Sequence, residues 1–430
     1  MKKEILRLAV PNILSNLSVP LLSSVDLMLI GHLGKSSFIG AVAVGGMIFS
    51  FLYWGFGFLR MGTTGLTAQG YGKRDFYKIS STLYRSLFSA FLIAFLIFSL
   101  QHFVKELSFY LIEASKEVEE LAEGYFEIRI FDAFAVLSLY VINGWLMGMQ
   151  NAKYTMYIVL FTNFLNVVLD AFFIYFLDMD VKGVALGTVI SQYAGVFLGL
   201  YFIFGKYGGK LVRISLREIF HIEEILEFAK LNSDIFVRTV SLIFAFSFFT
   251  AQSAKFGDDI LAANTILMQL WTVFAYGIDG FAFAAESLVG KYLAKSKELL
   301  RRIVKEIFYF GFGSALFFFA VLYLFPKEII SFFTDNQKVI LTASEYMGYT
   351  IVSPLINSFC YIWDGIYIGA TASRALRNSM LIAVFFIYLP TYYLTKSFLG
   401  NHSLWISMLL FMAARGALLS FMAKKEIFRG

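Results

Sequence analysis

The sequence predicts an all-α polytopic membrane protein with 12 transmembrane helices in two six-helix lobes. Of the 430 residues, 59% are hydrophobic and only 15% are charged, and the mean hydropathy is +0.71. These values lie far outside the range of soluble domains. The apolar residues form about a dozen runs of roughly 20 residues, which is the length of one helical span. The pattern of runs also repeats halfway along the chain.

Six of these runs lie in the first half. The first follows a basic start and continues to about residue 33, so it is too long for the apolar core of a signal peptide. Pro11 and Pro20 lie within it, and each removes a backbone hydrogen bond and permits a kink. The runs that follow cover residues 39–69, a stretch that ends near residue 103, and residues 124–147, 154–176 and 183–204.

The longest cytoplasmic connection separates the two halves. Within it, Ser215 and Glu218 are three residues apart, which predicts a capping box at the start of a short helix. The mixed basic and apolar pattern suits a helix that lies on the inner membrane interface. Six more runs cover residues 228–254, 260–290, 303–325, 343–368, 379–395 and 403–422. The predicted domains are residues 1–205 and 228–430, with residues 206–227 as a linker.

Identical or similar residues of the two halves match at one constant offset, the distance along the chain from Tyr125 to Tyr346. Asn143-Gly144 matches Asp364-Gly365, and Gly148 matches Gly369. Each half has an even number of spans, so both insert with the same orientation and form a parallel repeat about an axis along the membrane normal. At this offset Asp26 matches Ser247 and Asp170 matches Thr391. The acidic pair therefore belongs to the first half alone.

Lysine and arginine gather in alternate loops, which fixes the expected topology. The positive-inside rule places both termini in the cytoplasm, and the net charge of +6 reflects this asymmetry. A nucleic-acid-binding protein would need a basic soluble surface, which the sequence does not contain. Cys360 is the only cysteine and lies in an apolar run, so no disulfide framework is expected. We expect a multi-pass protein of a prokaryotic plasma (inner) membrane, a monomer in contact with lipid.

The run over residues 154–176 contains a polar stripe. Asn166 and Asp170 are four residues apart and Asn163 lies one turn earlier, so all three face the same neighbour. An ionised aspartate near the bilayer centre costs ~2.5–3.5 kcal/mol on insertion scales, so the stripe must face protein or a wet cavity. A carboxylate beside two amides in this setting predicts a cation or proton site.

Two further polar residues are expected at the same depth. Counting 1.5 Å per residue, Asp26 and Asp170 each lie roughly 10 Å below the outer face, and Thr188 lies at a similar depth in the sixth run. Carboxylates, an amide oxygen and a hydroxyl are hard oxygen donors that suit Na⁺ and equally a shared proton. Asp26, Asp170 and Thr188 can therefore share one layer, and with Asn166 they could hold one H⁺ or Na⁺ with no other cofactor.

Four motifs carry a family resemblance. They are FLRMGTTGLTAQ at residues 58–69, LNSDIFVRT at 231–239, DGFAFAAE at 279–286 and WDGIYIGAT at 363–371. In this order they resemble the DinF-type branch of the multidrug and toxic compound extrusion (MATE) transporters, over essentially the whole chain. The resemblance implies two six-helix lobes around a central cleft that export cationic or amphiphilic compounds, including antibiotics, in exchange for H⁺ or Na⁺.

The resemblance also implies roles for single residues. Asp26, Asn166, Asp170 and Thr188 match the family's functional positions, and Tyr125 and Asn143 match cavity positions. One departure is Leu22, where some relatives have a tyrosine one turn before the first-span acid. Pro20 is the candidate hinge that would let the first helix bend. Further candidates for the substrate cavity are Asn163, Asp279, Glu286 and Asp364, and for the three acids a packing or gating role is the alternative.

Two other classes of function make different demands on the sequence. A flippase for a lipid-linked saccharide would favour cationic cavity residues, for which the candidates are Arg60, Arg129 and Arg238. Asp234 and Arg238 are four residues apart, which favours a structural ion pair between them. An enzyme is not expected, because no nucleophile–base set, metal-ligand cluster or phosphate-binding glycine loop appears.

Overall fold

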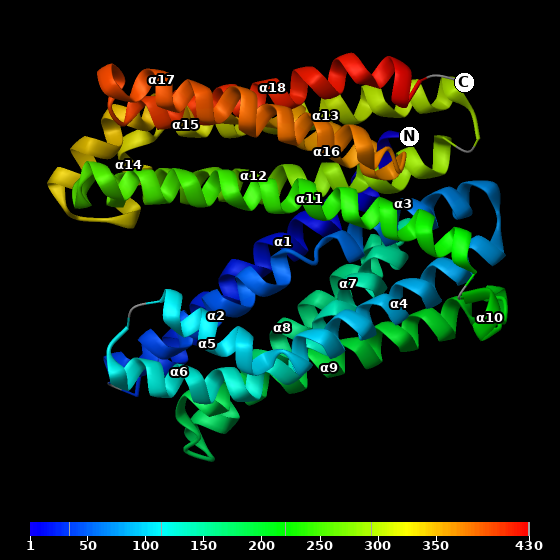
Figure 1. The fold of residues 1–430 in the computed structure, drawn as a ribbon, viewed down its shortest axis with the longest axis horizontal. Helices are drawn as coiled ribbons and strands as arrows, with labels where there is room; N and C mark the ends of the chain where they lie inside the picture. The colour runs from blue at the N-terminus through cyan, green and yellow to red at the C-terminus, as the bar shows by residue number, and fades with distance from the viewer. Residues whose placement is uncertain (34, 113, 220, 294, 429–430) are drawn as a thin grey trace. The chain divides into compact units, whose positions relative to one another are not determined.

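The computed structural model describes residues 1–428 apart from positions 34, 113, 220 and 294, and it leaves out the side chains at 23 and 216. The chain folds into two compact units. The N-terminal unit is Leu14–Glu227, and the C-terminal unit combines Met1–Ile13 with Phe228–Gly430. Helix α1 (Lys2–Gly31) contributes residues to both units (Figure 1). The domain boundaries expected from the sequence stay a prediction.

The N-terminal unit is built from long helices with short connections (Figure 1). Polar side chains cap several of these helices: the Asp75 carboxylate accepts from the Lys78 amide at 2.9 Å, and the Ser115 hydroxyl accepts from the Val118 amide. The helices are α2 (Ser36–Trp54), α3 (Phe58–Lys73), α4 (Phe76–Ser99), α5 (Gln101–Leu111), α6 (Lys116–Arg129), the 3-10 turn η1 (Ile130–Asp132), α7 (Ala133–Gly148), α8 (Ala152–Tyr175), α9 (Asp180–Tyr207), the 3-10 turn η2 (Gly208–Lys210) and α10 (Leu216–Ile219).

The C-terminal unit is also built from helices joined by short connections. Helix α15 packs against α12, α13 and α18, and Figure 1 shows these long helices running side by side. The helices are α11 (Ile222–Ser253), the 3-10 turn η3 (Ala254–Phe256), α12 (Asp258–Leu293), α13 (Lys297–Leu324), α14 (Pro326–Phe333), α15 (Gln337–Gly369), α16 (Ser373–Ile382), the π-helical turn η4 (Ala383–Tyr388), α17 (Leu389–Leu399) and α18 (His402–Glu426).

Twelve helical segments of the described chain are long and apolar enough to cross a membrane, which confirms the predicted number. Several helices begin about six residues before the expected spans, and three further departures affect the second, fourth and eleventh spans. The second span is divided into α2 and α3 at Gly55-Phe56-Gly57, where two glycines weaken the helix. The fourth span begins at Lys116, well before the predicted residue 124. The eleventh contains the π-helical turn, which sequence periodicity does not reveal.

The outer surfaces of the helices are apolar. Phe164 of α8 is 69% exposed and Phe197 of α9 is 70% exposed, and many other large hydrophobic side chains share this exposure. Apolar patches of this extent are rare on soluble proteins. Hydrocarbon is the solvent that suits them, so the exposed aromatic side chains support the assignment of a multi-pass membrane protein.

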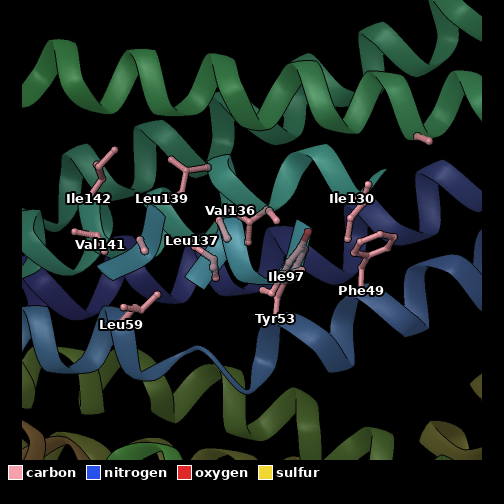
Figure 2. Packing of buried hydrophobic residues seen from close by; sticks show 14 of the residues in the cluster. Phe49, Tyr53, Leu59, Ile97, Ile130, Val136, Leu137, Leu139, Val141 and Ile142 are labelled. Atoms are coloured by element: carbon pink, nitrogen blue, oxygen red, sulfur yellow. The ribbon is translucent and has the colours of Figure 1, made fainter. Parts of the chain in front are cut away.

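The core of the N-terminal unit is tightly packed and rich in aromatic and branched side chains. Figure 2 shows part of it, where Phe49 of α2 lies beside Ile130 of η1. The rings of Phe49 and Phe126 stack with their centroids 5.2 Å apart. Since lipid is as apolar as such a core, close van der Waals packing is the main source of helix association here.

Glycines allow two helix pairs to approach at backbone distance. A methyl group at Gly144 of α7 would overlap the carbonyl oxygen of Arg60 in α3. A methyl group at Gly365 of α15 would overlap the carbonyl oxygen of Ala282 in α12. Small residues at helix crossings are the usual device for close packing in membranes. The same device therefore appears in both units.

Arg85 of α4 binds the connection that precedes α11. Arg85 of α4 donates from Nη2 to the Glu218 carbonyl at 2.7 Å and from Nε to the Ile219 carbonyl at 3.0 Å, and it pairs with Glu224. The predicted capping box is confirmed, because the Ser215 amide donates to the Glu218 carboxylate at 2.8 Å and the Glu218 amide donates back to the Ser215 hydroxyl. These hydrogen bonds from Ser215 hold the pKa of the Glu218 carboxyl below its usual value.

Candidate ion-binding site

The polar stripe predicted on α8 is buried inside the N-terminal unit. Asp170 is 0% exposed and Asn166 is 2% exposed. Asn166 Nδ2 donates to Asp170 Oδ1 at 2.9 Å and lies 3.4 Å from Thr188 Oγ1 on α9. The Thr188 hydroxyl in turn donates to the Val184 carbonyl at 2.9 Å. Helices α8 and α9 therefore bring three of the four predicted coupling residues together.

Helix α1 supplies the second carboxylate. Asp26 lies beside Asp170, and their carboxyl groups are close enough to interact directly. Asp26 Oδ1 and Asp170 Oδ2 are both buried and have no hydrogen-bond partner in the described structure. Buried carboxylate oxygens almost always have a partner, so two orphaned ones on neighbouring acids indicate a site that accepts a cation or proton.

The space beside Asp170 depends on a glycine. A methyl group at Gly187 of α9 would overlap Asp170 Oδ1. Since no side chain fills this position, the carboxylate can lie directly against α9. A side chain at this position would therefore displace the Asp170 carboxylate.

The donor set fits a hard monovalent cation or a proton. It comprises two carboxylates, the amide oxygen of Asn166 and the hydroxyl of Thr188. Oxygen donors of this kind bind Na⁺, and two adjacent carboxyls can also share a proton. Within the described residues no group of three histidine, cysteine, aspartate or glutamate side chains gathers.

A second buried network, which sequence reasoning missed, lies near the acid pair. Arg129 Nε donates to Asp132 Oδ2 at 2.6 Å, and Arg129 Nη1 donates to the Tyr125 hydroxyl at 2.5 Å. The Tyr53 hydroxyl donates to the other oxygen of Asp132. Arg129 is near enough to act electrostatically on both Asp26 and Asp170. The spacing of Arg129 and Asp132, three residues apart in an apolar span, was the available signal.

The other candidates of the N-terminal unit make no hydrogen bond to the Asp26 or Asp170 carboxylate in the described structure. Asn163 Nδ2 donates to the Ser18 hydroxyl of α1 at 2.9 Å. Tyr125 is committed to Arg129. Asn143 lies next to the glycine that contacts α3, and its Oδ1 is buried without a partner in the described structure. Pro20 lies inside the continuous helix α1, where its carbonyl accepts from the Ser24 hydroxyl at 3.0 Å.

The acids of the C-terminal unit have different surroundings. Asp364 of α15 is buried and paired with Arg238 and Arg415. Glu286 of α12 is 1% exposed, and Asp279 of the same helix is half-buried. These three acids remain candidates for a cavity or gating role.

The prediction of an ion pair between Asp234 and Arg238 is wrong. Arg238 instead binds Asp364, and Asp234 accepts from Arg377 Nη1 at 2.6 Å and from the Ser373 hydroxyl at 2.8 Å. The spacing of four residues would allow the local pair, but partners on other helices compete successfully for both side chains.

The fold and the buried acid pair together define a class: a polytopic helical membrane protein with a carboxylate site inside one of two similar units. The MatE family model matches residues 11–172 and again residues 235–394, so each half carries one copy of the pattern. The chain belongs to the MatE family, whose members are transporters and not enzymes.

Curated relatives agree with this assignment. The chain is 36% identical to DNA damage-inducible protein F of Escherichia coli strain K12 over 420 residues, which cover 96% of this chain and 90% of that protein. It is 21% identical to the multidrug export protein MepA of Staphylococcus saprophyticus over 393 residues, 90% of this chain and 86% of that protein.

A solved structure supports the same fold. A crystal structure of MATE in the bent conformation superposes with a TM-score of 0.89 at 20% identity, and the match covers 99% of this chain and 95% of that one. At this identity the likeness establishes the fold alone. The DinF-type resemblance expected from the motifs is confirmed by the family match and the Escherichia coli relative.

Proposed function

We propose that the chain is a secondary active exporter that extrudes organic cations or amphiphiles in exchange for H⁺ or Na⁺. The single observation that carries this proposal is the pair of orphaned carboxylate oxygens of Asp26 and Asp170 beside Asn166 and Thr188. Two carboxylates buried within the membrane cost free energy. A role in ion coupling would explain why the protein keeps them. The export of drugs by relatives such as MepA supports the direction and the substrate class.

The mechanism we propose is alternating access. Binding of H⁺ or Na⁺ at Asp26 and Asp170 removes the repulsion between the two carboxylates, and this changes the preferred packing of α1 against α8 and α9. Asn166 and Thr188 orient the carboxylate of Asp170 through the hydrogen bonds described above. Pro20 would let α1 bend as its acid changes charge. We place the protein in a prokaryotic inner membrane with both termini in the cytoplasm.

The test is transport of a fluorescent organic cation in reconstituted liposomes, with a proton gradient or a Na⁺ gradient imposed separately. We expect one gradient to drive transport by the wild type and both Asp26→Asn and Asp170→Asn to lose the coupling. Pro20→Ala should slow transport, and a wild-type rate for this variant would remove the hinge from the mechanism.

A steric variant offers a sharper control. Gly187→Ala puts a methyl group against Asp170 Oδ1, whereas Gly205→Ala on the same helix meets open space. We expect the first variant to lose coupled transport and the second to keep it. Equal activity of the two would contradict the assignment of the site to this pocket.

The flippase for a lipid-linked saccharide is the alternative. It gains support if a well-folded wild type moves no organic cation under either gradient. In the N-terminal unit, the candidate Arg129 already donates to Asp132 and to Tyr125, which leaves it less suited to bind a phosphate group. Lipid-linked substrates would be the next ones to assay.

A further inference from the structure

Two arginines meet one carboxylate in the interior of the C-terminal unit. Arg415 Nη2 of α18 donates to Asp364 Oδ2 of α15 at 2.6 Å, and Arg238 Nη2 of α11 donates to the same oxygen. Arg415 is 1% exposed, Asp364 is 6% exposed and Arg238 is 7% exposed. We call these three residues the arginine cluster. It joins three helices that are far apart in the sequence.

The arginine cluster carries a net positive charge. Guanidinium groups stay protonated in proteins, so two arginines and one carboxylate leave one excess positive charge. Among the described residues, Asp364 is the one acidic partner of both arginines. An excess charge buried in a region of low dielectric is strongly unfavourable unless a counter-ion is present.

The unused donors of the arginine cluster point to a missing acceptor. Arg238 Nε is buried and has no hydrogen-bond partner in the described structure. Arg415 Nη1 faces the thioether sulfur of Met412 at 3.1 Å, which is a weak acceptor. A guanidinium presents parallel N–H groups that match two oxygens of one oxyanion. An oxyanion would satisfy both the charge and the geometry.

Other buried or partly buried arginines among the described residues do not share this feature. Arg85, which is 8% exposed, pairs with Glu224. Arg129 has its own carboxylate, Asp132, and a tyrosine hydroxyl. Arg377 has Asp234, and the pair is partly exposed to solvent. The excess charge is therefore a property of the arginine cluster and not a general feature of arginines in this fold.

We propose that Arg238 and Arg415 form a binding site for an oxyanion, of the carboxylate, sulfate or phosphate class. Asp364 holds the two guanidinium groups in place and limits the affinity by competing with the ligand for their donors. The oxyanion is either dissolved in water or carried on the headgroup of an anionic lipid, since both present the same chemistry.

The test measures binding and not transport, so it does not depend on the proposed exporter activity. The purified full-length chain in neutral detergent is titrated with radiolabelled sulfate at constant ionic strength, and its Tm is followed as chloride is replaced by sulfate. Sulfate stabilises most proteins somewhat by exclusion from their surface, so the informative quantity is the difference between variants. A second arm replaces dissolved sulfate by phosphatidylglycerol, with phosphatidylcholine as the neutral lipid.

We expect sulfate or phosphatidylglycerol to raise the Tm of the wild type by several degrees more than that of Arg238→Gln. Arg377→Gln changes the charge of the same unit equally and should behave as the wild type. Arg238→Lys keeps the charge but loses the fork of donors, so it should bind more weakly and still fold. Asp364→Asn frees both guanidinium groups and should bind sulfate about tenfold more tightly, because the competing carboxylate is gone.

The outcomes separate the two sources and the competing explanation. A response to dissolved sulfate assigns the site to a soluble oxyanion, and a response to phosphatidylglycerol alone assigns it to a lipid headgroup. A purely structural cluster would bind neither and would show the same Tm change in the wild type, Arg238→Gln and Arg377→Gln. That result would overturn the proposal even if Asp364→Asn failed to fold.

Discussion

The two units share backbone geometry but differ in the charges that they bury. Gln150 and Thr371, which correspond at the offset of the repeat, both have positive φ, at 64° and 55°. The amides of Met149, Gln150 and Asn151 make the same three hydrogen bonds after α7 as those of Ala370, Thr371 and Ala372 make after α15. The glycines at the close helix contacts, Gly144 of α7 and Gly365 of α15, also correspond at this offset. The repeat is therefore preserved in turns and helix crossings.

Buried charge follows a different pattern. The N-terminal unit carries two adjacent carboxylates with orphaned oxygens, whereas the C-terminal unit carries two arginines around one carboxylate. At the matched position, Asn143 of α7 corresponds to Asp364 of α15. Backbone packing constrains the fold in both halves, while side chains inside each unit are free to diverge. This difference supports the proposal that the two units bind ligands of opposite charge.

The largest expected effect comes from replacing one buried aspartate by asparagine in each unit, as two separate variants. Asp364→Asn leaves two buried guanidinium groups without a carboxylate, and breaking a buried ion pair in this way costs about 3–5 kcal/mol. Asp170→Asn keeps the neighbouring amide and removes a carboxylate whose second oxygen has no partner in the described structure, so the stability should not fall. Thermal unfolding in a weakly binding buffer measures both. A loss of similar size in the two variants would contradict the opposite polarity of the units.

A smaller effect is expected where the units are alike. Gly144→Ala and Gly365→Ala each place a methyl group into a backbone carbonyl that cannot move aside, which should cost about 1–3 kcal/mol in both units. Gly348→Ala is the control on α15, since a methyl group there meets nothing. It should stabilise the helix by about 0.5–1 kcal/mol. The midpoint of thermal unfolding separates these cases, and neutral Gly365→Ala would mean that the crossing is looser than described.

The smallest effect concerns the two strained turns. Left-handed backbone costs a residue with a Cβ roughly 1–2 kcal/mol, and β-branched residues adopt it least readily. Thr371→Gly should therefore stabilise the C-terminal unit by about 1 kcal/mol, and Gln150→Gly should stabilise the N-terminal unit by less. Thr371→Ala keeps the Cβ and should gain little. If glycine and alanine at position 371 gave equal unfolding midpoints, strain would not explain the turn.

The number of spans and the polar stripe of α8 could be predicted because both follow from local patterns, whereas Asp26 was placed beside the stripe by counting depth along its helix and by the family resemblance. Apolar runs indicate spans through the membrane, and Asn166 and Asp170 share a helix face by their spacing. The arginine cluster could not be predicted, because Asp364 and Arg415 lie on different helices and no local rule joins them. Asp234 shows that local spacing can also mislead. Its spacing favours a pair with Arg238, but it binds Arg377 and Ser373 instead.

The π-helical turn Ala383–Tyr388 changes which residues of the two repeats correspond. Helices α8 and α16 begin at Ala152 and Ser373, which keep the offset of the repeat, but α9 and α18 begin at Asp180 and His402, whose offset is longer by a single position. A π turn bonds residue i to i+5 and thus absorbs one extra residue. Beyond it, the counterpart of Asp170 is Tyr392, which is buried as Asp170 is and donates its hydroxyl to Gln252 at 3.1 Å. A phenol in one repeat thus holds the place of an acid in the other, and comparison at a single fixed offset conceals this exchange.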